Sequence, residues 1–226
     1  MLYIVGTPIG NLEDLSLRQA RILTSVNIVY AEDTRNTYQL LMRLEGLFGL
    51  KRKSQQKLIS FYKDVEYEKV NEILELAVDQ DIAVVSDSGM PLISDPGFLL
   101  VKHAIKKNIP FTVIPGPTAI TTALVYSGFN PQTHMFIGFL PKKKGEVKKL
   151  FQRLQKVKEL FSDAVFVAYE SAKRIESSLE ILESLDSNTQ VAIGREMTKK
   201  FEEIIRGTPA ELKTRTYKGE LTLVIS

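Results

Sequence analysis

The stretch Ile82-Ala-Val-Val-Ser-Asp-Ser-Gly-Met-Pro-Leu-Ile-Ser-Asp-Pro-Gly97 contains the strongest indication of the fold. Its first four residues, Ile82 to Val85, are apolar, as in a strand that is buried on both faces. Small polar residues follow, and open α/β sheets bind ligands just beyond the carboxyl ends of their strands. About nine residues, Ser86 to Ser94, precede the next predicted helix, whereas such connections usually take two to six. We therefore predict that this loop contacts a ligand.

The same stretch predicts where the following helix begins. Asp95 suits the N-cap position and Pro96 suits the first helical position. The helix is expected over 97–107.

Strands and helices alternate through the first half of the chain, which predicts a largely parallel sheet with helices on both faces. The expected strands are 2–5, 27–31, 58–60, 82–85 and 111–114, and the other expected helices are 15–23, 36–44 and 65–78. The second half has more consecutive strands, which indicates a mixed sheet. The expected strands there are 135–140, 164–169, 190–194, 201–207 and 220–225, with helices at 118–126, 146–160 and 171–185.

Pro115-Gly116-Pro117 is the strongest break in the sequence. We expect it to link an N-terminal α/β domain, residues 1–114, to a C-terminal α/β domain, residues 118–226.

The composition excludes several classes of site. The chain has 226 residues, no cysteine and two histidines, so disulfides, thiolate nucleophiles and multi-histidine metal centres are not expected. No apolar run is long enough for a membrane span and no signal peptide is evident, which predicts a cytoplasmic protein. The net charge of +3 permits an anionic partner without requiring one.

A nucleotide site of the Rossmann type is the first alternative, because Gly6-x-x-x-Gly10 follows a strand and Glu32 or Asp33 ends the next one. The spacing is not G-x-G-x-x-G, and Pro8 interrupts the run of N–H groups that would hold a pyrophosphate. A ligand without phosphates fits better. Acidic residues follow several strands, but no spacing typical of a metal site supports a metal. Helix N-capping is the simpler interpretation of Asp95 and Asp33.

Basic residues gather in two segments, 51–57 and 142–158. The second contains a single acidic residue, Glu146, and one-signed charge over a loop and a helix favours contact with a phosphate backbone. The residues of these segments expected to contact a phosphate backbone are Lys51, Arg52, Lys53, Lys142, Lys143, Lys144, Lys148 and Lys149. The first segment is expected to be an exposed loop.

Several motifs together resemble one family. They are Tyr-Ile-Val-Gly-Thr-Pro-Ile-Gly-Asn-Leu at 3–12, Ala-Glu-Asp-Thr-Arg at 31–35, Val-Ser-Asp-Ser-Gly-Met-Pro-Leu-Ile-Ser-Asp-Pro-Gly at 85–97, Pro-Gly-Pro-Thr at 115–118, Gly-Phe-Leu-Pro-Lys-Lys-Lys-Gly at 138–145, Tyr-Glu-Ser at 169–171, Arg-Glu-Met-Thr-Lys at 195–199 and Gly-Glu at 219–220. They resemble the ribosomal RNA small subunit methyltransferase I family of the tetrapyrrole methylase superfamily, the class III S-adenosylmethionine (SAM) methyltransferases.

The resemblance implies 2′-O-methylation of a cytidine in 16S ribosomal RNA. It also implies a homodimer and SAM bound in a cleft between two α/β domains. Carried onto this sequence, the implied SAM-binding residues are Pro8, Asp87, Gly89, Met90, Leu92, Ile93, Ser94, Thr118, Ala119, Tyr169, Glu170, Met197, Glu220 and Leu221.

Transfer to a ribose hydroxyl needs alignment of the reacting atoms and a base for the hydroxyl proton. Asp33, Glu32 and Glu170 are the candidate bases, and Arg35 and Arg195 are candidates for holding the flanking phosphates. No metal is required. The alternatives are a tetrapyrrole methylase acting on uroporphyrinogen or a precorrin, and a catalytically silent RNA-binding assembly factor. The modest net charge and the absence of an additional C-terminal helical domain favour an assembled small ribosomal subunit over free RNA as the partner.

Overall fold

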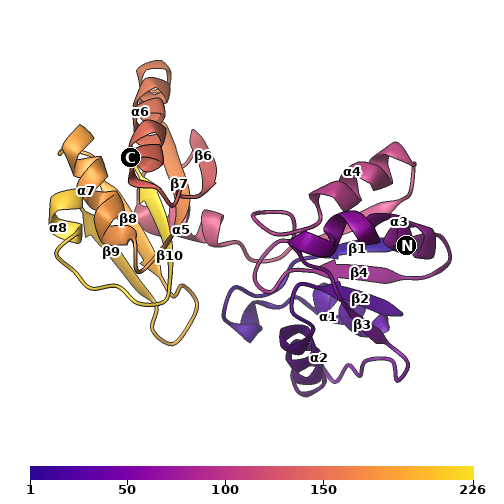
Figure 1. Cartoon of the computed structure of the whole chain (residues 1–226). Helices are drawn as coiled ribbons and strands as arrows, with labels where there is room; N and C mark the ends of the chain where they lie inside the picture. The colour runs from indigo at the N-terminus through magenta and orange to yellow at the C-terminus, as the bar shows by residue number, and fades with distance from the viewer. The chain divides into compact units, whose positions relative to one another are not determined.

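The computed structural model describes all 226 residues and divides into two compact units, Met1–Thr118 and Ala119–Ser226. Each unit has its own sheet, as Figure 1 shows. Each also has its own hydrophobic core.

The first unit is a five-stranded parallel sheet with the strand order β3-β2-β4-β1-β5. Its elements are β1 Leu2–Val5, η1 Leu12–Asp14, α1 Leu17–Ser25, β2 Ile28–Ala31, α2 Thr34–Phe48, β3 Lys57–Ser60, η2 Lys63–Val65, α3 Glu66–Asp79, β4 Ile82–Val85, α4 Phe98–Lys106 and β5 Phe111–Ile114. All four residues of β2 and of β4 are buried, as expected for strands that are covered on both faces.

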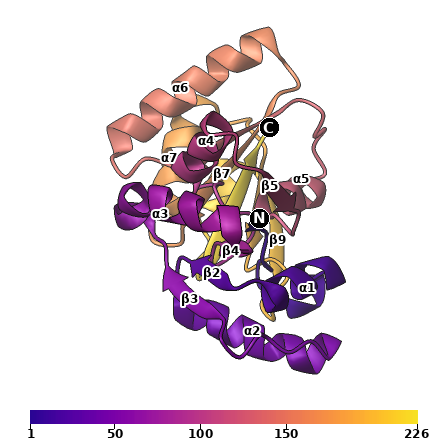
Figure 2. The same cartoon turned by 90° about the vertical axis from the view of Figure 1, so that its right-hand side faces the viewer.

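Alternate residues of these strands build two separate cores. Ile4, Tyr30 and Val84 pack with α3 and α4, whereas Val5 and Val85 pack with α1 and α2. Figure 2 shows α3 and α4 apart from α1 and α2. The predicted parallel sheet with helices on both faces is confirmed.

The second unit is a five-stranded mixed sheet with the strand order β6-β7-β10-β8-β9, in which only β6 and β7 are parallel. Its elements are α5 Ala119–Ser127, β6 His134–Phe139, α6 Lys144–Leu160, β7 Val165–Ser171, α7 Ile175–Leu185, β8 Val191–Arg195, β9 Glu203–Gly207, α8 Pro209–Leu212 and β10 Glu220–Ile225. The helices α6, α7 and α8 pack in the core on one face, and α5 packs in the core on the other. The mixed sheet is also as predicted.

The start of α4 was predicted wrongly. The helix begins at Phe98 with Gly97 as its N-cap, and Asp95 and Pro96 lie before it. The carboxylate of Glu66, from the first turn of α3, accepts hydrogen bonds from the backbone N–H groups of Gly97 and Leu99 at 3.0 and 2.9 Å. The carboxylate of Glu66 in α3 thus caps α4 in place of the predicted N-cap, Asp95.

The loop before β3 is exposed as predicted, apart from Gln56 and the half-buried Arg52. Helix α2 continues to Phe48, and Gly49, with a φ of 67°, ends it in the left-handed conformation. Gln56 is buried, and its side-chain amide donates to the carbonyl groups of Leu23 and Val26. This contact ties the segment to the end of α1.

No helix in the structure has both the length and the apolar character needed to cross a membrane.

Candidate functional site

The neighbouring strands β1 and β4 form the topological switch point of the first sheet. The chain leaves β1 toward α1 on one face of the sheet and leaves β4 toward α4 on the other. Ligands of open α/β sheets bind at such points. The two loops are joined here, because the backbone N–H of Thr7 donates to the carbonyl of Gly89 at 2.8 Å.

The loop between β4 and α4 is a strained turn. Leu92 and Ser94 have φ values of 72° and 73°, and Gly89 has a φ of 80°. Left-handed backbone at residues other than glycine has an energetic cost and is concentrated at functional sites. The loop predicted to bind a ligand therefore has a distinctive backbone beside the switch point.

The predicted SAM-binding residues of this turn differ in exposure. The backbone of Gly89 is buried beside Ile9 and the carbonyl of Pro117. Met90 is half-buried, with its sulfur against Gly6, whereas the other residues range from half-buried, for Leu92, to exposed, for Ile93 and Ser94.

The Pro-Gly-Pro-Thr segment runs beside this turn. Gly116 packs backbone to backbone against Gly6, so that a Cβ at either position would lie about 3 Å from main-chain atoms of the other. This packing brings the end of β5 to the switch point. Thr118 is the last residue of the first unit and Ala119 begins α5 in the second.

Carboxylates gather at the ends of β2 and β4. Asp87 accepts hydrogen bonds from the backbone N–H of Asp33 at 3.0 Å and from the side-chain amide of Asn36 at 3.1 Å. Glu32 accepts a long hydrogen bond, 3.5 Å, from the backbone N–H of Asp87. The structure thus brings together Glu32, Asp33 and Asp87, which the sequence predicted as site residues.

Asp33 is held by Arg35 and by helix α2. It is the N-cap residue of α2, as the capping interpretation predicted, and its carboxylate accepts from the backbone N–H of Arg35 at 2.8 Å. The same carboxylate forms an ion pair with the exposed guanidinium of Arg35 at 2.5 Å. The hydrogen bond from the Arg35 side chain lowers the pKa of Asp33 to about 2.

Asp95 is the carboxylate that the sequence did not assign to the site. Burial, and after it the negative charge of Glu32, raise its pKa to about 6, while a hydrogen bond with Ser86 acts in the opposite direction. Its position after a strand end was visible in the sequence, but the pattern Asp-Pro-Gly favoured a helix cap instead.

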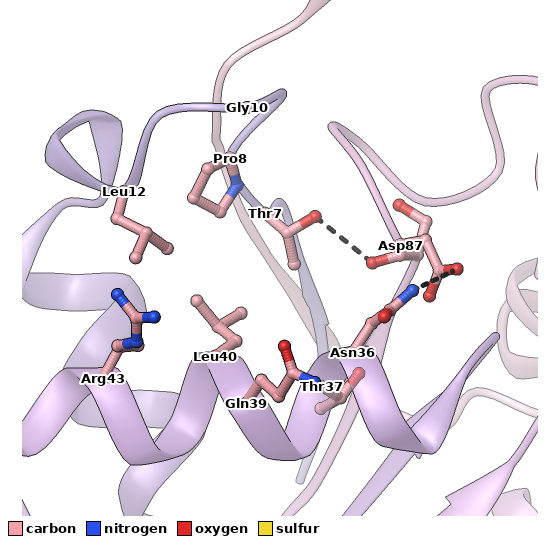
Figure 3. A pocket seen from close by; sticks show the side chains of 11 residues that line it. Thr7, Pro8, Gly10, Leu12, Asn36, Thr37, Gln39, Leu40, Arg43 and Asp87 are labelled. Carbon is pink, nitrogen blue, oxygen red and sulfur yellow. Dashed lines mark hydrogen bonds between the residues drawn. The ribbon is translucent and has the colours of Figure 1, made fainter. Parts of the chain in front are cut away.

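A cavity of about 280 Å³ opens between the loop after β1 and helix α2 (Figure 3). Its lining residues are Thr7, Pro8, Gly10, Leu12, Asn36, Thr37, Gln39, Leu40, Arg43, Ser86 and Asp87. Only Pro8 and Asp87 among them were predicted from the sequence. The i, i+3, i+7 spacing of Asn36, Gln39 and Arg43 was the available signal, since it places them on one face of the helix.

The predicted site residues of the second unit lie on two different faces of its sheet. Leu221 belongs to the core beside α6 and α7, whereas Met197 belongs to the core beside α5. Tyr169 packs edge-on against Phe136 and Phe139, with ring centroids 5.0 and 5.2 Å apart. The side chains of Leu221 and Met197 therefore cannot meet one ligand on the same face.

The carboxylate of Glu170 is buried and fully engaged. It forms an ion pair with Arg174 at 2.6 Å and accepts hydrogen bonds from the hydroxyl of Ser178 at 2.7 Å and from the backbone N–H of Ser171 at 2.6 Å. These partners tie β7 to the start of α7. At the beginning of β10, Glu220 pairs with Lys199 at 2.7 Å.

The predicted RNA-binding cations differ in how far they are already paired. Lys51 pairs with Glu45 at 3.1 Å, Lys53 donates to the side chain of Asn27, and Arg195 pairs with Glu203 at 3.1 Å. The guanidinium of Arg52 lies over the ring of Tyr38 and donates to the carbonyl of Gln56.

The cations around the start of α6 are more available. Lys142, Lys143, Lys144, Lys148 and Lys149 are exposed, and of these only Lys143 has a carboxylate partner, Glu146 at 3.9 Å. The loop before α6 and its first turns are therefore the main unpaired basic surface among the predicted residues.

Residues 1–213 match the family model described as Tetrapyrrole (Corrin/Porphyrin) Methylases. Two solved structures share the fold at 15% sequence identity. Diphthine synthase aligns with a TM-score of 0.72 over 99% of this chain and 88% of its own chain. The methyltransferase CobJ aligns with a TM-score of 0.69 over 100% of this chain and 93% of its own chain.

Curated relatives match over the full length of this chain. A protein of Hydrogenobaculum sp. (strain Y04AAS1) is 43% identical over 95% of its own length, and one of Thermotoga maritima is 38% identical over 97%. One of Streptococcus pyogenes serotype M3 is 40% identical over 76%. Each is named "Ribosomal RNA small subunit methyltransferase I". With this identity along the whole chain, and with the sheet and loops described above, the chain belongs to the ribosomal RNA small subunit methyltransferase I family of the tetrapyrrole methylases, and it is a methyltransferase.

Proposed function

We propose that this protein transfers the methyl group of SAM to the ribose 2′-hydroxyl of a cytidine in 16S ribosomal RNA within the small ribosomal subunit. The names of the full-length relatives support the RNA substrate. Such a substrate implies a cytoplasmic protein. The homodimer and the binding residues of the second unit are further predictions of the resemblance.

The observation that best supports the SAM site is the strained turn beside the switch point. It joins a buried glycine backbone at Gly89 to a group of carboxylates. The carboxylates Glu32, Asp87 and Asp95 suit a ligand that carries positive charge, because none of them forms an ion pair with a protein cation. The nearby Arg35 pairs with Asp33 instead. SAM would supply a methyl group that is already activated by the sulfonium charge. The first unit would hold it through Pro8 and the turn Asp87–Ser94.

The task of the protein is then to align the ribose hydroxyl and to accept its proton. Orientation of the reacting groups is worth up to about 7–11 kcal/mol, and a positioned base adds roughly 10²–10⁴-fold. Asp95 suits the second role best, since its pKa of about 6 lies near the working pH. Asp33 is a weak proton acceptor because of its low pKa, and Arg35 beside it is exposed for contact with a phosphate.

Substitution of Gly89 by valine tests the SAM site. The branched side chain would fill the space where the ligand approaches the backbone and would meet Ile9. Gly49→Val is the matched control, because Gly49 has a similar positive φ but open space around it. Both variants should lose about 1–2 kcal/mol of stability from the left-handed backbone. Only Gly89→Val should lose SAM binding in calorimetry, and a Gly89→Val protein that binds SAM as tightly as Gly49→Val would show that the site is elsewhere.

The two alternatives have distinct outcomes. A protein that binds SAM and methylates uroporphyrinogen, but not RNA, would be a tetrapyrrole methylase. A protein that binds ribosomal RNA without binding SAM would be an assembly factor.

A further inference from the structure

The cavity between the loop after β1 and helix α2 has a chemistry of its own. It shares Pro8 and Asp87 with the proposed SAM site, but no residue of 88–94 lines it. The cavity therefore lies beside the turn and opens toward α2. Its volume of about 280 Å³ is close to the lower end of the range for small-ligand pockets, about 300–1,000 Å³. That size suits one nucleotide and is small for a tetrapyrrole.

Two sides of the cavity carry apolar side chains. Pro8 and Leu12 lie on one side and Leu40 of α2 lies on the other, as Figure 3 shows. Apolar side chains on two sides suit the flat faces of a nucleobase.

Its polar groups are placed toward opposite ends. Asn36 and Asp87 are hydrogen-bonded to each other at 3.1 Å at one end, and Arg43 lies at the other, one helical turn beyond Gln39 (Figure 3). Both oxygens of Asp87 have lone pairs that can accept hydrogen bonds from the amino group of a base. The side-chain amide of Gln39 offers a donor and an acceptor between the two ends.

Arg43 forms no ion pair with a carboxylate, and it is the one arginine that lines the cavity. An unpaired guanidinium at the mouth of a cavity attracts an anion, and its planar fork matches the geometry of a phosphate. The positive charge of Arg43 therefore suits the phosphate end of a nucleotide.

We propose that this cavity binds one nucleotide of the RNA substrate, with the base between Pro8, Leu12 and Leu40 and the phosphate on Arg43. The proposal deepens the proposed function and rests on it for the identity of the polymer, but the binding of a nucleotide can be tested by itself. The carboxylate end of the cavity lies beside the proposed SAM turn through Asp87.

The test uses the full chain labelled with ¹⁵N and titrated with cytidine 5′-monophosphate. The side-chain amide signals of Asn36 and Gln39 should shift in a saturable manner. Arg43→Ala should weaken this binding about tenfold or more, since a charge-assisted contact is lost. Arg43→Lys should weaken it less, and Arg21→Ala, which removes an exposed arginine of α1 outside the cavity, should leave it unchanged. Ribose 5-phosphate, which lacks the base, should bind more weakly than the nucleotide.

Three results would overturn the proposal. They are unshifted amide signals of Asn36 and Gln39, equal binding of cytidine 5′-monophosphate by Arg43→Ala and wild type, and a loss of SAM affinity in Arg43→Ala that would make the cavity part of the cofactor site. Failure of the proposed function has a different signature. A wild-type protein that binds the nucleotide in this cavity but transfers no methyl group to RNA would leave the nucleotide site in place and remove the ribosomal RNA reaction.

Discussion

At the residue scale, the carboxylate of Glu170 is already satisfied by Arg174, Ser178 and the backbone of Ser171. Its side chain is fully buried on the side of the sheet covered by α7. A base for a ribose proton must reach the substrate, whereas Glu170 reaches only its own helix and strand. The Tyr-Glu-Ser motif suggested a catalytic or binding role, yet these contacts are those of a residue that holds β7 to α7.

Removal of this carboxylate should therefore reduce stability. Glu170→Ala leaves Arg174 partly buried without its partner, which should lower the free energy of unfolding by about 3 kcal/mol. Glu170→Gln keeps part of the hydrogen bonding and should lose less. Urea unfolding of the two variants measures the difference. A fully stable Glu170→Ala protein without methyltransferase activity would instead assign Glu170 to the chemistry.

Asp95 should make stability depend on pH in the opposite direction from most acidic residues. Its pKa is raised from 3.8 to about 6 in the folded protein, so the folded state binds the proton more tightly than the unfolded state does. The stabilising effect is complete below about pH 4 and is lost as the pH rises through about 6. Asp95→Asn should therefore be more stable than wild type at pH 7–8, and this advantage should shrink as the pH falls from 6 to 4. Thermal unfolding across this range checks the prediction, and a constant difference at every pH would contradict it.

At the scale of single elements, the strands were more predictable than the helix ends. The expected strands 2–5, 82–85 and 111–114 match β1, β4 and β5 residue for residue. The agreement is best explained for β4, which is buried throughout, because a strand covered on both faces needs a continuous apolar segment. The start of α4 was not predictable in the same way. Its capping group, Glu66, lies 31 residues before Gly97, and no local pattern connects them.

The cap from Glu66 should stabilise α4 measurably. Glu66 is buried and accepts two backbone hydrogen bonds, so Glu66→Ala leaves two donors of Gly97 and Leu99 without a partner. The expected loss is about 1–3 kcal/mol, as for other buried unsatisfied groups. Glu68→Ala, on the same helix and exposed, is the control. Slower hydrogen exchange at Leu99 in Glu66→Ala than in wild type would contradict the capping role.

At the scale of the whole molecule, the sequence predicted two α/β units, and the structure has both. The cavity was not predicted, since its lining comes from the loop after β1, helix α2 and the loop after β4, which only the parallel sheet brings together. The pairing of Lys51, Arg52 and Lys53 within the first unit could not be predicted either.

The unpaired lysines at the start of α6 leave a compact basic surface in the second unit. With a net charge of only +3, such a surface favours a shaped RNA target over any bare strand.

The central claim is ribose methylation of RNA in the small ribosomal subunit, and labelled methyl transfer tests it most directly. Purified small subunits and naked 16S ribosomal RNA are each incubated with the protein and labelled SAM, and the modified nucleotide is identified by mass spectrometry. The account predicts label on the ribose of a cytidine in the subunit and much less label on naked RNA. Equal labelling of both would contradict the subunit as the substrate, and label on a base, or on neither RNA, would contradict ribose methylation itself.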